Sequence, residues 1–102
     1  MYIAMNRFRV AEDKTAEFEK AWKERERHLS EMDGFLLFQV LKGKPIDGAV
    51  TYISKTDWET EHFFTQWTES EQFKAAHKGA KMEKGIILGP PNFEGYEVIM
   101  EE

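Results

Sequence analysis

Apolar and polar residues alternate along residues 2–10 in the two-residue period of a β-strand. One face of this strand carries Tyr2, Ala4, Asn6, Phe8 and Val10. From residue 18 onward the period lengthens to that of an amphipathic helix, whose buried face would carry Phe18, Ala21, Trp22, Arg25 and Leu29. Asp33-Gly34 supplies a stop for this helix, since glycine adopts the left-handed conformation at low cost. The chain is therefore expected to begin with a strand and a helix.

The middle of the chain has the pattern of two strands joined by a turn. Residues 35–41 form an apolar run of strand length, and residues 50–54 alternate again. Between them, the segment 44–48 contains a proline and an Asp-Gly pair, which are typical of turns. We expect the two strands to pair in antiparallel fashion.

Two capping boxes then predict two short helices. Thr56 and Glu59 are three residues apart and predict a helix that runs to about Trp67. Thr68 and Glu71 have the same spacing and predict a second helix that continues to Ala80. A loop rich in glycine and proline follows at 82–92, and residues 93–100 alternate as a last strand.

The order β-α-β-β-α(α)-β predicts an α+β protein of the ferredoxin-like split β-α-β type, with a four-stranded antiparallel sheet and helices on one face. One domain spans residues 1–102. Ile3 and Met5 point to the other face, and both faces of segments 35–41 and 50–54 carry apolar residues. We therefore expect a homodimer whose two sheets form a β-barrel. A monomer with a mixed outer face is the alternative.

Composition narrows the function classes. Hydrophobic residues make up 41% of the chain and charged residues 32%, which is typical of a soluble globular protein. The net charge of -5 argues against nucleic-acid binding. The start of the chain lacks a signal-peptide pattern, and no apolar run reaches the ~20 residues of a membrane span. The absence of cysteine excludes thiolate chemistry. We expect a cytoplasmic protein without membrane or nucleic-acid partners.

The aromatic residues are more numerous than a core of this size obviously requires: eight Phe, three Trp and three Tyr. Among possible functional residues, Asn6 lies on an apolar strand face, Trp67 precedes Thr68, and His77 follows Phe73 on one helix face. Each has a structural alternative: a local backbone contact or a position near the sheet edge for Asn6, a hydrophobic staple for Trp67, and a surface or core position for His77. A single His on an apolar face is also how proteins bind haem iron.

The whole chain resembles the antibiotic-biosynthesis-monooxygenase (ABM) domains, and more narrowly the IsdG-type haem-degrading monooxygenases. The resemblance rests on IAMNRFRV around Asn6, the Asp33-Gly34-Phe35 junction, WETEHFFTQW ending in Trp67, and SEQFKAAH ending in His77. That family is defined by an Asn on the first strand, a Trp at the end of the second helical region and a His on the next helix. These positions correspond to Asn6, Trp67 and His77.

The resemblance implies a function for each of these residues. His77 would be the proximal ligand of the haem iron, and Asn6 would donate a hydrogen bond on the opposite side. Trp67 would press the porphyrin out of plane. Haem would be both substrate and cofactor, used with O2 and an external electron donor, either a reductase or a small reductant. The products would be a linear tetrapyrrole and iron. Phe8, Phe64 and Phe73 could add apolar wall, with ordinary core packing as the alternative.

Further features near His77 have two interpretations each. The 82–92 loop could cover the haem or plug the core. Three lysines could offset the haem carboxylates or form a solvated helix edge: Lys74, Lys78 and Lys81. Two other functions also remain open. One is a cofactor-independent ABM monooxygenase that acts on a quinol or polycyclic phenol, with Asn6 and Trp67 positioning the substrate. The other is a non-catalytic haem carrier or sensor.

Overall fold

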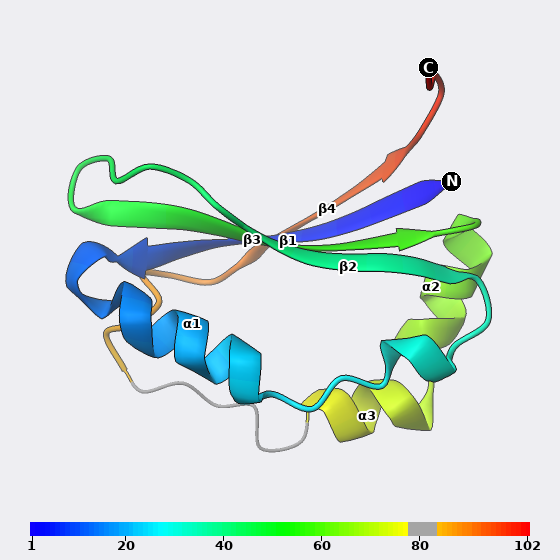
Figure 1. The fold of residues 1–102 in the computed structure, drawn as a ribbon, viewed down its shortest axis with the longest axis horizontal. Coiled ribbons are helices and arrows are strands. Elements are labelled where there is room, and N and C mark those ends of the chain that lie inside the picture. Colours follow the sequence, from blue (N-terminus) through cyan, green and yellow to red (C-terminus); the bar gives the residue numbers. More distant parts are fainter. Residues whose placement is uncertain (78–83) are drawn as a thin grey trace.

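The computed structural model describes residues 1–77 and 84–102 and contains one sheet with three α-helices on one side (Figure 1). The strands follow the order β2-β3-β1-β4, and all neighbours are antiparallel. The elements along the chain are β1 (Tyr2–Ala11), a 3-10 turn (Glu12–Lys14), α1 (Thr15–Glu24), a 3-10 turn (Leu29–Glu31), β2 (Phe35–Lys42), β3 (Ala49–Trp58), α2 (Glu61–Thr68), α3 (Glu71–His77) and β4 (Asn92–Glu97). The ferredoxin-like fold is confirmed.

The register of the central strands confirms the predicted faces of β1. Tyr2 lies opposite Trp58, Phe8 opposite Tyr52, and Val10 opposite Val50. Directly opposed residues of antiparallel strands project on the same face. This face is the one that the helices cover, because Tyr52 and Val10 pack with Phe18 of α1.

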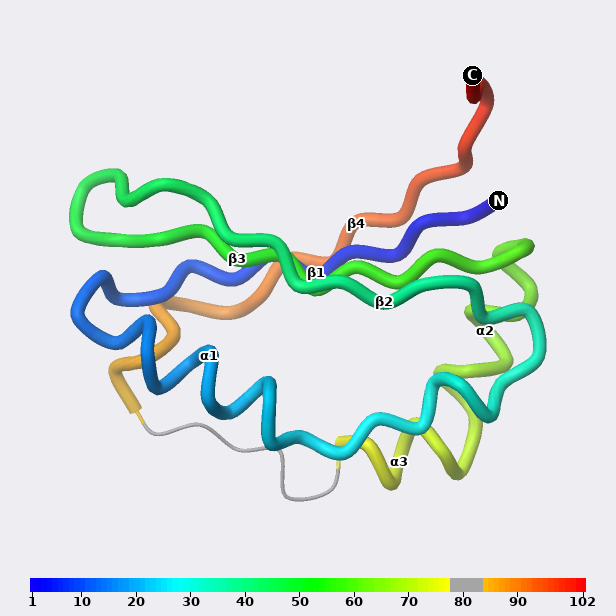
Figure 2. The backbone as a smooth tube through the Cα atoms, viewed as in Figure 1, coloured from blue at the N-terminus to red at the C-terminus, as the bar shows by residue number. Residues whose placement is uncertain are grey.

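Two separate clusters of buried side chains hold the helices on the sheet. The first cluster lies under α1 and contains Val10, Phe18, Val50, Tyr52 and Ile86. The second cluster lies under α2 and α3 and contains Leu29, Trp58, Trp67 and Ala76. Figure 2 shows the corresponding arrangement of the backbone, with α1 below one end of the sheet and α2 and α3 below the other.

A row of residues crosses the middle of the helix-facing side between these clusters. It runs from Val40 on β2 through Ser54 and Asn6 to Phe93 on β4, and we call it the central row. Val40 is 37% exposed, Phe93 is 52% exposed, and Asn6 is also exposed. Ser54 is buried. The sheet is therefore covered at its two ends and largely uncovered in between.

The first helix is shorter than its apolar pattern predicts. It ends at Glu24, and Arg25 is already extended with φ -71 and ψ 133. The guanidinium of Arg27 donates to the Trp22 carbonyl over 2.8 Å, and that carbonyl lies in the last turn of the helix. Leu29 consequently leaves the helix and packs in the second cluster. The apolar pattern therefore predicted the helix correctly as far as Trp22, but its extension to Leu29 was wrong.

The stop signal predicted at Asp33-Gly34 has a different role. Gly34 has a φ of 78 and lies in the turn that enters β2, well after the end of α1. A Cβ at this position would lie 2.2 Å from Cγ of Phe63. The glycine is therefore required both by its backbone conformation and by the close approach of α2.

The predicted capping box at Thr56 and Glu59 is wrong, because β3 continues to Trp58 and α2 begins at Glu61. Trp58 is fully buried and pairs with both Tyr2 and Phe35, so sheet pairing and burial override the local helix signal. The hydroxyl of Thr56 accepts a hydrogen bond from the Trp58 indole over 2.9 Å.

The second predicted box is shifted by two residues. The hydroxyl of Ser70, not Thr68, accepts from the backbone N–H of Phe73 over 3.0 Å and caps α3. Thr68 instead donates to the Thr65 carbonyl within α2. The predicted extension of this helix to Ala80 lies outside the described residues. The last strand also ends earlier than predicted, at Glu97.

The outer face of the sheet carries no helix from the described part of the chain (Figure 1). Ile3, Met5 and Ile53 are half-buried there. Leu37 and Leu41 of β2 are 44% and 40% exposed. The predicted apolar outer face is therefore present, while its pairing with a second copy remains a prediction. None of the helices in residues 1–77 and 84–102 combines the length and hydropathy needed to cross a membrane.

Candidate functional site

Asn6 lies at the middle of β1, in the central row. Its neighbours across the sheet are Ser54 and Phe93. The Asn6 side chain is exposed and has no hydrogen-bond partner in the described part of the chain. The local backbone contact that would explain a strand Asn structurally is therefore not seen. Its amide is available to a ligand on the helix-facing side.

His77 is the last described residue of α3, a helix that lies on the helix-facing side of the sheet (Figure 1). Its Nδ1 lies 2.7 Å from the Phe73 carbonyl oxygen. A carbonyl only accepts hydrogen bonds, so Nδ1 carries the proton and Nε2 keeps its lone pair. The ring packs on Phe73 with 4.0 Å between centroids, and the residue is exposed. His77 is thus held in the tautomer and orientation suited to binding a metal ion through Nε2.

The surroundings of His77 also keep its ring neutral. Burial against its neighbours lowers the pKa of His77, and the positive charge of Arg25 lowers it further, whereas the Phe73 carbonyl acts in the opposite direction. The Nε of Arg25 donates to the Ala76 carbonyl over 3.2 Å, and its guanidinium lies 4.6 Å from the Trp22 ring centroid. Arg25 therefore ties the end of α1 to the end of α3 and disfavours the imidazolium. A neutral imidazole is the form that ligates iron.

Trp67 is buried, with 6% of its surface exposed. Its ring lies 6.2 Å from that of Trp58 and meets Phe73 edge-on at 5.4 Å. Phe73 in turn packs on His77, so the structure connects Trp67 to His77 through Phe73. In this arrangement Trp67 supports the helix that carries the histidine.

The other two predicted aromatic residues belong to opposite ends of the sheet. Phe8 packs on Phe18 and Trp22 beside the first cluster, with centroid distances of 5.6 and 6.1 Å. Phe64 packs beside the second cluster and stacks almost parallel on Phe93, with centroids 5.5 Å apart and planes at 6°. Aromatic walls therefore approach the central row from both ends.

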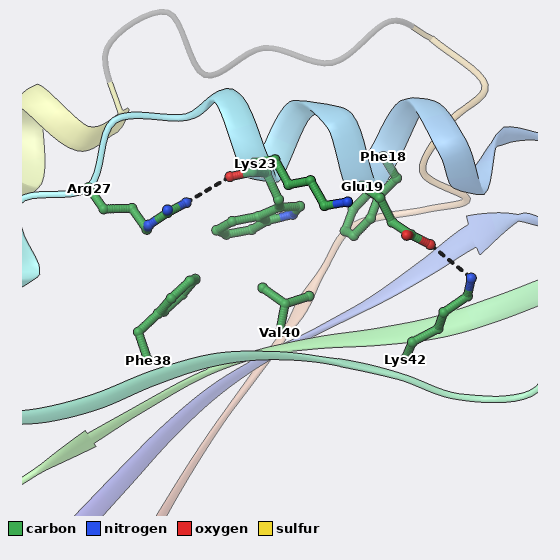
Figure 3. A pocket seen from close by; sticks show the side chains of 8 residues that line it. Phe18, Glu19, Lys23, Arg27, Phe38, Val40 and Lys42 are labelled. Atoms are coloured by element: carbon green, nitrogen blue, oxygen red, sulfur yellow. Dashed lines mark hydrogen bonds and ion pairs between the residues drawn. The ribbon is translucent and has the colours of Figure 1, made fainter.

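A pocket between α1 and β2 was missed by the sequence reasoning (Figure 3). Its volume is about 370 Å³, and it is lined by Phe18, Glu19, Trp22, Lys23, Arg27, Phe38, Val40 and Lys42. Val40 is also the β2 member of the central row. The pocket thus opens along the same sheet face as Asn6. The high aromatic content was the sequence signal for it, but no pattern indicated that Trp22 and Phe38 would face each other.

The charges in this pocket are partly paired. Glu19 accepts hydrogen bonds from Lys42 over 2.8 Å and from the Tyr52 hydroxyl, and both lower the pKa of its carboxyl. The pKa of Tyr52 is raised, first by burial and then by Glu19. Lys42 is therefore committed to Glu19 on one side of the pocket.

Part of the predicted loop is held against β1. Ile86 is buried in the first cluster, and its carbonyl accepts from the Ala11 amide over 2.9 Å. At this residue the plug interpretation is correct. Lys74 forms an exposed ion pair with Glu71 at 3.3 Å. Residues 82 and 83 of the loop, together with Lys78 and Lys81, lie outside the described residues.

Across residues 1–77 and 84–102 there is no cluster of three or more His, Asp or Glu side chains that could hold a metal ion.

Residues 1–79 match the sequence model of the family described as "Antibiotic biosynthesis monooxygenase". The chain belongs to this family. As an ABM-family protein it shares 40% identity over 68 residues with a "Heme-degrading monooxygenase" of Shouchella clausii (strain KSM-K16). That match covers 64% of this chain, and the chain spans only 60% of the length of that curated relative.

Solved structures resemble the ABM-family chain over nearly its full length. The heme-degrader MhuD of Mycobacterium tuberculosis, with two hemes bound in its active site, is 25% identical with a TM-score of 0.74; the match covers 100% of this chain and 99% of MhuD. SnoaB, a cofactor-independent oxygenase from Streptomyces nogalater, is 17% identical with a TM-score of 0.65, covering 98% of this chain and 94% of SnoaB. The likeness to SnoaB extends to the fold alone.

Proposed function

We propose that this ABM-family protein is a haem-degrading monooxygenase. It binds haem over the central row, between Asn6 and His77, and uses O2 and external electrons to open the porphyrin ring. The products are iron and a linear tetrapyrrole. The observation that carries the proposal is the fixed tautomer of His77, whose Nε2 has no hydrogen-bond partner among the described residues and lies on a helix at the same sheet face as the exposed Asn6.

The comparisons support haem over a quinol or phenol as the substrate. The Shouchella clausii relative is described as degrading heme, and MhuD holds hemes in its active site. SnoaB, which needs no cofactor, is less similar in both identity and TM-score than MhuD.

The residues of the site have separate tasks in this proposal. His77 holds the iron through Nε2, and the Phe73 carbonyl fixes the ring, while burial and to a lesser degree Arg25 lower the pKa of His77 and favour the neutral ring. Bound haem supplies the site of oxygen activation and the carbon that is oxidised. The Asn6 amide donates a hydrogen bond where negative charge develops, which is the usual work of a preorganised donor. Trp67 positions Phe73 and presses on the macrocycle.

The outer face and the electron supply complete the proposal. The apolar residues of the outer face, which include Ile53 and Leu41, pair with those of a second copy, so that two sheets form a barrel. We expect the dimer mass in light scattering after gel filtration. A monomer mass would contradict the pairing. The protein works in the cytoplasm with a reductase or a small reductant as its electron donor.

The test is aerobic turnover of haem with ascorbate or a reductase, followed by absorbance and product mass. We expect the Soret band of the wild-type complex to disappear and a ring-opened tetrapyrrole to form. His77→Ala is expected to abolish this reaction. His62→Ala removes an exposed histidine from α2 and serves as the matched control.

Two results would contradict the proposal. A Soret band that survives reductant and O2 would identify a haem carrier. A wild-type protein that gives no stoichiometric Soret shift on titration would favour the cofactor-independent reaction.

A further inference from the structure

Lys23 and Arg27 are basic side chains that line the pocket between α1 and β2, and Lys23 lies close enough to Glu19 to contribute, after Lys42 and Tyr52, to the lowered pKa of that carboxyl. Lys42 pairs with Glu19, but neither Lys23 nor Arg27 forms an ion pair within the described part of the chain. Arg27 is nevertheless held in place. Its Nη1 donates to the Trp22 carbonyl over 2.8 Å, and its guanidinium lies 5.6 Å from the Phe38 ring centroid (Figure 3).

These cations gather in a protein whose net charge is -5. Burial lowers the pKa of the Arg25 guanidinium, and the nearby charge of Arg27 lowers it further. Like charges brought together in this way repel each other unless an anion lies between them. At the end of α1, Glu24 lies near Lys20 and Glu26 lies near His28, which leaves the two guanidinium groups as the charges that an anionic ligand can approach.

The rest of the pocket is apolar and flat-walled. The Trp22 and Phe38 rings face each other with centroids 5.9 Å apart and planes at 32°. The Trp22 indole N–H is buried and has no hydrogen-bond partner in the described part of the chain, so a donor is left for a ligand that accepts. A ligand that suits this pocket is flat and apolar and carries anionic groups at one edge.

The pocket and the uncovered Asn6 belong to one sheet face. Val40 lines the pocket and lies opposite Ser54, which lies opposite Asn6. Neighbouring strands are about 4.8 Å apart, so Val40 and Asn6 are separated by about 10 Å across the sheet. A macrocycle over the central row would therefore bring one edge to the mouth of this pocket.

We propose that Lys23 and Arg27 bind the two propionate carboxylates of haem, so that the propionate edge of the macrocycle faces outward between α1 and β2. This inference rests on the proposed function and adds the orientation of its substrate. Lys42 has no part in it, because Glu19 already neutralises it. The two contacts are ion pairs near the surface, so they should weaken as ionic strength rises.

The test compares binding of haem with binding of its dimethyl ester, which keeps the iron and the macrocycle but lacks the carboxylate charges. Lys23→Gln with Arg27→Gln removes both charges while keeping most of the side-chain length. We expect the double variant to bind haem about tenfold more weakly than the wild type does. The double variant should bind the dimethyl ester with the same affinity as the wild type. Lys20→Gln, on the same helix and outside this pocket, is the matched control and should bind both ligands like the wild type.

Three results would contradict the proposed orientation or the proposed function. Unchanged haem affinity in the double variant would overturn the orientation while leaving the proposed function intact. An equal loss for haem and ester would also overturn it, since charge would then not be the cause. Failure of the wild type to bind either ligand would overturn the proposed function itself. Far-UV circular dichroism and thermal unfolding verify that the double variant is folded.

Discussion

The two ends of the sheet both bury aromatic side chains, but the sequence patterns predicted the residues of one end better than those of the other. The first cluster, under α1, contains Val10, Phe18 and Val50, which all fall at the expected positions of predicted elements. The second cluster, under α2 and α3, contains Leu29 and Trp58, which lie in other elements than local patterns predict. The end that carries His77 is therefore assembled by tertiary contacts more than by local signals.

The difference also explains why the centre of the sheet is uncovered. Helix α1 ends at Glu24, before it reaches the second cluster, and the described part of α3 lies at the other end of the sheet. Between them the central row presents Asn6 to the helix-facing side. Among the described residues, the centre of this face is therefore less covered by helices than its two ends.

The largest expected effect comes from removing the middle of the second cluster. Trp58→Ala deletes a fully buried ring that contacts Phe35, Phe64 and Trp67, and should lower the free energy of unfolding by about 3–5 kcal/mol. Urea unfolding followed by circular dichroism measures this loss. Haem affinity should fall as well, because this cluster positions α3.

Val50→Ala is the matched change in the first cluster, where it deletes a side chain that is 1% exposed. It should destabilise the protein but leave haem affinity close to that of the wild type. Equal losses of haem affinity in the two variants would show that both ends position the site.

Asn6→Ala should separate chemistry from stability. Removing one preorganised donor typically lowers turnover by about 10²–10³-fold. Because the side chain is exposed, the free energy of unfolding should change by less than about 0.5 kcal/mol, and haem should still bind. Single-turnover absorbance measures the rate, with Asn92→Ala on the outer face as control. Haem degradation by Asn6→Ala at the wild-type rate would refute the assigned role.

The sequence predicted the order of the elements along the chain, the antiparallel hairpin and the two faces of the first strand, because these depend on a two-residue alternation that burial enforces. It also singled out Asn6 and His77, whose residue types are unusual in their patterns. It could not predict the ends of the helices, since Trp58 and Leu29 are placed by contacts with distant residues.

The pocket could not be predicted for the same reason. Trp22 and Phe38 come from α1 and β2, and only the packing of these two elements makes their rings face each other. The tautomer of His77 depends on a backbone carbonyl one turn earlier, so it required the helix geometry. The residue type identified His77 as a candidate ligand, and the helix geometry determined which of its nitrogens carries the proton.

The cap of α3 offers a smaller effect that tests the corrected helix boundary. Ser70→Ala removes the acceptor for the Phe73 N–H and should lower the free energy of unfolding by about 1 kcal/mol. Thr68→Ala, at the position that the sequence favoured, should cost less than half as much because Thr68 bonds within α2. Thermal unfolding of both variants measures the difference. A larger loss of unfolding free energy in Thr68→Ala than in Ser70→Ala would show that Thr68 caps α3, as the sequence pattern predicted.

The smallest expected effect concerns the charge beside His77. Arg25→Gln removes a repulsion and should raise the pKa of His77 toward its ordinary value of 6.5, which NMR titration of the haem-free protein measures. The lowered pKa means that the unfolded chain binds the proton more readily. The free energy of unfolding therefore decreases as pH falls below about 6.5, because protonation of His77 favours the unfolded chain. Arg25→Gln should make this decrease smaller. A pKa that stays unchanged in Arg25→Gln would assign the shift to burial alone.

The central claim is that His77 alone ligates haem over the uncovered centre of the sheet, and haem titration followed at the Soret band tests it most directly. We predict a stoichiometric shift for the wild type, its loss in His77→Ala, and its return when imidazole is added to the variant. The same Soret band in His77→Ala without imidazole would contradict the claim.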